Sequence, residues 1–155
     1  MSTPATAKKV LHVGKYFPPD VGGMETYLDG LVRALATLNV TPSVLVHQSQ
    51  ISLHSSEESL SANGIALRVV RAATWCRLLF TPISPTFPWL LRRLIKREQP
   101  DVLHLHLPNP SAFWALALPY AAASAARDPL VSVLRVGVRA AIDRRCSKVA
   151  LPHHR

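Results

Sequence analysis

Short apolar runs alternate with amphipathic stretches along the first 120 residues, and this order predicts alternating strands and helices. Each run is closed by glycine, proline or polar residues, which is typical of a short buried strand. The predicted strands are Lys9–Gly14, Ser43–His47, Ile65–Val70 and Asp101–His106. Apolar runs of this kind suit a parallel sheet that is covered on both faces.

Helices are predicted between these strands. Apolar residues recur at helical spacing from Met24 to about Leu38. A second amphipathic helix begins at Trp89 and is stopped by Pro100. Ser111 is expected to cap a third, alanine-rich helix that runs to about Tyr120.

Three other stretches give weaker patterns. Residues 48–63 are rich in serine and glutamate and are predicted to be a loop, and residues 74–88 are expected to be irregular because prolines interrupt any helix. Residues 130–138 are apolar enough for a fifth strand. The whole order predicts an α/β fold with a doubly wound, Rossmann-like parallel sheet, whose ligands bind beyond the carboxyl ends of the strands. The loops after Gly14 and His106 are therefore the expected functional loops.

Length and charge bound the domain organisation. A chain of 155 residues, 48% hydrophobic and 17% charged, has room for one folded domain and is not disordered throughout. Residues 127–155 hold seven Lys or Arg against two Asp, so they supply +5 of the net charge of +9. We expect a disordered segment at 1–8, a domain at 9–126, and an irregular basic tail at 127–155 that is out of frame or degenerate.

Targeting signals are weak, and the expected location is the cytoplasm. Lys8 and Lys9 are followed by only a five-residue run, Val10 to Gly14, before the polar Lys15, which is too short for a secretory signal. The longest apolar run, 111–126, is interrupted by Pro119 and falls short of the ~20 residues that span a bilayer.

The strongest local signal is the loop from Gly14 to Glu25, which joins a strand to a helix. Gly22 and Gly23 remove side chains where backbone amides at a helix N-terminus can approach an anion. Two glycines can equally make a tight turn with no ligand. The spacing alone leaves both interpretations open, and it fits neither a Walker motif nor Gly-x-Gly-x-x-Gly.

Two motifs in this order resemble a known family. Lys15-x-x-Pro-Pro-x-x-Gly-Gly-x-Glu25, following a strand that ends in Val-Gly, is similar to the start of family-4 glycosyltransferases of GT-B fold. Pro100-Asp-Val-Leu-His-Leu-His-Leu-Pro-Asn109 resembles a later strand of the same family. The resemblance covers about 8–120 and implies the N-terminal half of a retaining, metal-independent enzyme that moves a sugar from a nucleotide donor to an acceptor.

The resemblance also implies where substrate binds, because the glycine loop of this family lies near the donor phosphates and the acceptor. The candidate substrate- or phosphate-binding residues are Lys15, Gly22, Gly23, Glu25, His106 and Asn109. Glu25 has a second interpretation, because a carboxylate in the first helical turn is favoured by the helix dipole. No catalytic residue is assigned.

His104 and His106 alternate with leucines, so both are expected on one face of the sheet, with His106 nearer its carboxyl end. His106 either lines the cleft and bonds to substrate or packs beneath a helix, as we expect for His104. A His-x-His pair can indicate a metal, but no third ligand stands at suitable spacing, so no metal is predicted. No cofactor is expected beyond the nucleotide sugar as substrate.

Departures from the family pattern bear on activity. The predicted strand at 130–138 lacks the expected histidine, and the four glutamates form no Glu-x7-Glu donor motif. We therefore expect an acceptor-binding domain that is inactive alone because the donor domain is missing. The alternative is a stand-alone acceptor- or membrane-binding subunit that works with a separate donor-binding chain.

The second helix carries a basic face: Arg92, Arg93, Lys96 and Arg97. Such a face can rest peripherally on anionic lipid, which would suit a lipid-linked rather than a free sugar acceptor, or it can simply be solvated. Nucleic acid is not expected as a partner, because aromatic residues are few and are not interleaved with the basic ones.

Overall fold

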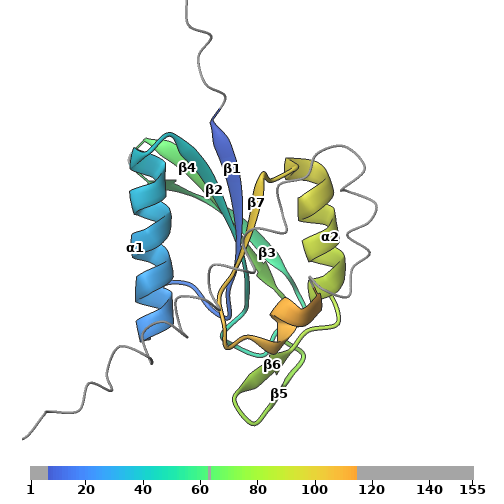
Figure 1. The fold of residues 1–155 in the computed structure, drawn as a ribbon. Helices are drawn as coiled ribbons and strands as arrows, with labels where there is room; N and C mark the ends of the chain where they lie inside the picture. Colours follow the sequence, from blue (N-terminus) through green and yellow to red (C-terminus); the bar gives the residue numbers. More distant parts are fainter. Residues whose placement is uncertain (1–6, 63, 115–155) are drawn as a thin grey trace, which may run out of the picture.

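The computed structural model describes residues 7–62 and 64–114, which form a five-stranded sheet with a helix against each face and a separate two-stranded hairpin (Figure 1). The main-sheet strands are β1 (Lys8–Val13), β2 (Val40–His47), β3 (Ser56–Ala62), β4 (Ile65–Ala72) and β7 (Val102–Leu105). The remaining elements are α1 (Gly23–Thr37), β5 (Cys76–Leu78), β6 (Thr81–Ile83), α2 (Phe87–Glu98) and the short 3₁₀ helix η1 (Pro110–Phe113).

The strand order is β3-β4-β2-β1-β7, and four of these strands are parallel. β1 lies between β2 and β7, and β4 pairs with the other side of β2. The predicted α/β, Rossmann-like class is confirmed for the described residues, with one difference. β3 runs antiparallel to β4 and makes the sheet mixed.

The prediction of a loop over 48–63 is wrong for β3. The strand lacks an apolar period because it lies at the edge of the sheet, where its polar side chains reach solvent or pair with arginines of neighbouring elements. Leu60 packs against a hydrophobic cluster. The turn into β4 uses Gly64 at a φ of +78°, a conformation that favours glycine.

The core has two layers, one on each face of the sheet. Leu11 and Val13 of β1 pack with Leu91 of α2, whereas Val44 and Val46 of β2 pack with α1. Because helices cover both faces, successive strand residues are buried on opposite sides, and the strands read as continuous apolar runs.

Other boundaries differ modestly from the prediction. α2 begins at Phe87 rather than Trp89, because Pro88 falls in the first turn, where a missing N–H costs nothing. The stretch predicted as irregular contains the β5–β6 hairpin. In the segment predicted as a Ser111-capped helix, the structure describes η1, capped instead by Asn109. The predicted tail at 127–155 and strand at 130–138 lie outside the described residues.

Candidate functional site

The carboxyl ends of β1, β2 and β7 meet at one edge of the sheet and are joined by backbone hydrogen bonds. The Gly14 amide donates to Leu45 O at 3.0 Å, the His47 amide to Lys15 O at 2.9 Å, and the His106 amide to Val13 O at 2.9 Å. We call residues 14–23, 47 and 106–111 the rim. Among the predicted site residues, Lys15, Gly22, Gly23, His106 and Asn109 lie on the rim, and Glu25 lies just beyond it.

The glycine pair begins α1, and the two glycines have different surroundings. Gly22 is the N-cap, and a β-carbon on it would collide with the carboxylate of Glu25, which folds back over the cap. Nothing described lies within 4 Å of a β-carbon on Gly23. Glu25 therefore lies in the first turn, where the helix dipole favours a carboxylate. The open side of the turn is at Gly23.

Arg71 of β4 anchors the glycine loop, and the sequence analysis missed it. The buried guanidinium donates to Phe17 O at 3.1 Å and to Pro18 O at 2.6 Å. It also pairs with Glu58 of β3 at 2.7 Å. The available signal was an arginine inside an otherwise apolar strand, which rarely buries its charge without partners.

Asn109 joins the two functional loops. Its amide nitrogen donates to Gly14 O at 2.8 Å, and its side-chain oxygen accepts from the Ser111 amide at 3.2 Å. The side chain is buried. Both polar ends are thus bonded within the protein, and a substrate contact by Asn109 stays a prediction.

His47 and Lys15 lie on the same rim. The Nε2 of His47 bonds with Ser111 Oγ at 3.0 Å, and its ring stacks on Phe87 at 4.4 Å between centroids. Burial, aided by the nearby Lys15 charge, lowers the pKa of His47 to about 4. The Lys15 ammonium lies 5.2 Å from the centre of the Tyr16 ring.

Three histidines gather on the face of the sheet opposite α2. His104 and His106 share this face, as predicted, and His106 lies at the carboxyl end of β7. His12 of β1 is the register partner of His104, and its Nδ1 lies 3.1 Å from Nε2 of His106. The expectation that no third ligand lies nearby is wrong, because strand pairing brings together residues that are 92 positions apart.

Burial keeps these imidazoles neutral. It is the main cause that lowers the pKa of His12 to about 3 and of His106 to about 4, with repulsion between neighbouring histidines adding to both shifts. Burial also lowers the pKa of His104.

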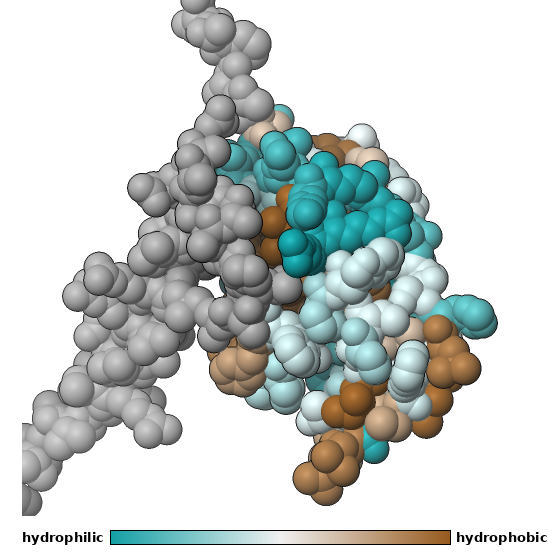
Figure 2. All heavy atoms as spheres, turned by 90° about the vertical axis from the view of Figure 1, so that its right-hand side faces the viewer, coloured by the Kyte–Doolittle hydropathy of each residue, from teal (hydrophilic) through white to brown (hydrophobic). Residues whose placement is uncertain are grey.

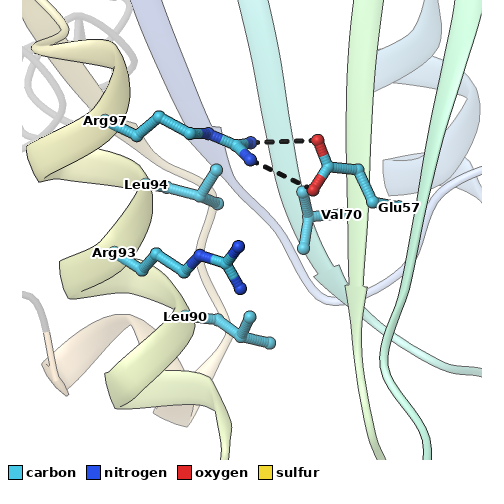
Figure 3. A pocket seen from close by; sticks show the side chains of 6 residues that line it. All are labelled: Glu57, Val70, Leu90, Arg93, Leu94 and Arg97. Carbon is cyan, nitrogen blue, oxygen red and sulfur yellow. Dashed lines mark hydrogen bonds and ion pairs between the residues drawn. The ribbon is translucent and has the colours of Figure 1, made fainter.

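The basic residues of α2 divide into two groups. Arg97 makes a two-pronged contact with Glu57 of β3, at 3.0 and 3.2 Å, and lines a small hollow over Val70 (Figure 3). Arg92, Arg93 and Lys96 are exposed and form no ion pair among the described residues. Neither described helix is both long and apolar enough to cross a membrane.

Figure 2 shows this side of the molecule, with hydrophilic surface over α2 and hydrophobic surface at its lower end, where the β5–β6 hairpin lies. The hairpin exposes Leu78, Leu79 and Phe80 at 68%, 87% and 86% of their surface. A shallow groove of about 570 Å³ runs beside α2 and is lined by Trp89 and the four basic residues.

Comparison with known families gives one match. The description Glycosyltransferase Family 4 applies to residues 21–134, well over half of the chain. The matched segment begins just before Gly22 and includes α1, the whole of β7 and the rim residues that follow it. The comparison with curated proteins finds no match.

Proposed function

Because the chain belongs to glycosyltransferase family 4, we propose that its Rossmann-like domain is the acceptor-side domain of a glycosyl-transferring enzyme. Membership of the family supports glycosyl transfer in general. The narrower proposal, that this domain binds the acceptor, rests on the rim. The observation behind this proposal is that the family match falls on a domain with one main sheet, and that the glycine loop lies at the carboxyl edge of this sheet. Ligands of open α/β sheets bind at this edge.

The rim offers two kinds of contact to substrate. The N-terminus of α1 presents backbone amides at the positive end of the helix dipole, and the free space at Gly23 lets a phosphate approach them. His106, next to this helix end, is held within 6.2 Å of Tyr27 between ring centroids and offers a neutral imidazole to a sugar hydroxyl. Lys15 supplies a positive charge on the same rim.

We propose further that transfer needs a donor-binding domain, on the same or on a separate polypeptide. The 155 residues contain no Glu-x7-Glu pair, and one sheet unit cannot close around both substrates. The test incubates the purified chain with radiolabelled UDP-glucose or GDP-mannose, with a membrane lipid extract as acceptor. We expect no sugar release or transfer, and turnover by the pure chain would refute the requirement.

A second experiment, in which a donor-binding domain is added, distinguishes a chain that lacks its partner domain from a chain that is not a glycosyltransferase domain. Adding a donor-binding domain of the same family should restore transfer, and Gly23→Leu should reduce it by filling the open side of the turn. Lys8→Leu, far from the rim at the start of β1, is the matched control and should have no effect. Equal activity of Gly23→Leu and the control would refute a substrate role for this turn.

We also propose that the acceptor lies in or on an anionic membrane. Figure 2 shows hydrophobic surface at the β5–β6 hairpin and hydrophilic surface over α2 on the same side of the molecule. The hairpin exposes Leu78, Leu79 and Phe80, and α2 carries the unpaired cations. Apolar side chains that enter the interface next to Lys and Arg are what anionic lipid favours. Each basic residue near such a surface contributes about 1 kcal/mol.

Vesicle flotation tests this surface with phosphatidylcholine alone and with added phosphatidylglycerol. Arg92→Glu/Arg93→Glu and Leu79→Ser/Phe80→Ser should each weaken binding to anionic vesicles at least tenfold. The control Lys8→Glu/Arg33→Glu makes the same charge change away from α2 and should bind as wild type. Equal binding by all four proteins would refute a membrane role for this side.

A further inference from the structure

We propose that His12, His104 and His106 form a zinc site that ties β1 to β7. One candidate ligand nitrogen from each residue lies within 4.8 Å of the others. The three side chains share one face because His12 and His104 are register partners and His106 is two residues further along.

One of the nitrogen separations already suits a tetrahedral ion, and the candidate ligand atoms all lie within 4.8 Å of one another. Zinc–nitrogen bonds of 2.0–2.1 Å place two imidazole nitrogens of a tetrahedral site about 3.3 Å apart. His12 Nδ1 and His106 Nε2 already lie 3.1 Å apart. His104 is half-buried, its ring centroid lies 4.3 Å from that of His106, and a closer approach would break no hydrogen bond among the described residues.

One nitrogen of this cluster is buried without a hydrogen-bond partner among the described residues. Six ring nitrogens meet here, and the described residues provide one hydrogen bond, between His12 and His106. The other nitrogen of His12 is buried with no partner. Buried polar atoms are normally bonded, so this unpartnered nitrogen of His12 marks a cluster that the described residues do not satisfy by themselves.

The donor set favours zinc among common divalent ions. Three imidazoles without a carboxylate suit zinc and other late transition metals, whereas magnesium and calcium require oxygen. An imidazole binds a metal through one nitrogen and keeps its proton on the other, so the proton between His12 Nδ1 and His106 Nε2 would move to the outer nitrogen of its own ring. Water would take the fourth position, as it does in other three-histidine sites.

The site would stiffen the rim rather than perform the chemistry. It joins β1 to β7, which is the last described strand on that side of the sheet. A bound ion would also take the lone pair of His106 Nε2 and leave the proton on Nδ1, so this residue could only donate a hydrogen bond to a sugar hydroxyl. Zinc would therefore stabilise the fold and fix the way in which His106 meets the acceptor.

The test uses the full chain after treatment with EDTA. Titration with ZnCl₂ should show one ion per chain, and a hundredfold excess over Kd should raise the Tm by about 10 °C. CoCl₂ should give the intense visible absorption of four-coordinate cobalt. MgCl₂ should produce neither effect.

Two variants locate the site. His104→Ala should abolish stoichiometric zinc binding, and its half-buried position lets the fold survive. The control His54→Ala/His153→Ala/His154→Ala removes histidines outside the cluster and should bind as wild type. Zinc binding that persists in His104→Ala, or that disappears in the control, would overturn the proposal.

A measurement on unaltered protein covers the case in which His104→Ala fails to fold. X-ray absorption of the zinc-loaded wild type should give three imidazole nitrogens at 2.0–2.1 Å. Oxygen-only coordination, or an absence of stoichiometric binding, would leave the cluster as a hydrogen-bonded histidine group and refute the zinc site.

Discussion

Acidification should destabilise the fold through His47, and the size of the effect follows from its surroundings. The side chain is fully buried against Phe87 and bonded to Ser111, with a folded-state pKa of about 4 against an ordinary value of 6.5. The unfolded chain therefore takes up a proton first as the pH falls. The contribution of His47 to the free energy of unfolding is complete above about pH 6.5 and is lost as the pH approaches 4.

The magnitude comes from proton linkage. A shift of about 2.5 pKa units corresponds to about 3 kcal/mol in full, of which about 2 kcal/mol is lost between pH 7 and pH 5. A domain of this size has a free energy of unfolding of about 5–15 kcal/mol, so one histidine accounts for a measurable share.

Urea unfolding followed by tryptophan fluorescence at pH 7 and pH 5 measures this loss. His47→Gln retains a group that bonds with Ser111 but does not titrate, so its loss between the two pH values should be about 2 kcal/mol smaller than that of wild type. His54→Gln removes an exposed histidine and should keep the wild-type loss. The same loss in His47→Gln and wild type would refute the reasoning.

Three further stability predictions concern the rim and Arg71, which anchors it, and each is measured by urea unfolding at pH 7. Gly23→Ala should stabilise the chain by about 0.5 kcal/mol, whereas Gly22→Ala should cost about 1 kcal/mol because Glu25 must move; equal effects would contradict the packing. Arg71→Met should cost about 2–3 kcal/mol because two loop carbonyls lose a charged donor, and a loss under about 0.5 kcal/mol would remove it as the anchor. Asn109→Ala should cost about 2 kcal/mol, and Asn109→Asp less because an acceptor for the Ser111 amide remains; the reverse order would contradict the assigned bonds.

The sequence predicted those parts of the fold that show a periodic pattern of apolar residues or that begin and end at turn residues. α1 and the central strands β1, β2, β4 and β7 are buried by neighbours on both sides, so their apolar residues follow the geometry of the element. The strand β3 was not predicted, because ion pairs with β4 and α2 rather than apolar contacts stabilise its side chains. Charged pairs across strands leave no apolar period for a pattern to detect.

The candidate site was predicted as a set of loops but not as a set of contacts. The glycine turn and His106 were found because both lie at strand ends along the chain. Arg71 and His12 escaped because their roles depend on residues 54 and 94 positions away in sequence. Sequence spacing places ligands within one element, whereas only strand register reveals ligands on neighbouring elements.

The same register explains why one edge of the sheet can serve several purposes. Asn109 and Arg71 hold the two loops of the rim through backbone carbonyls, so neither fixes the side chains that face a ligand. The open turn at Gly23 remains free to meet substrate, whereas His106 is buried and faces His12 through Nε2, which leaves Nδ1 for a substrate contact. A change at His12 should therefore alter the basicity of His106 without touching substrate. Because His12 acts on His106 in this way, metal binding at the histidine group and glycosyl transfer at the rim would be coupled.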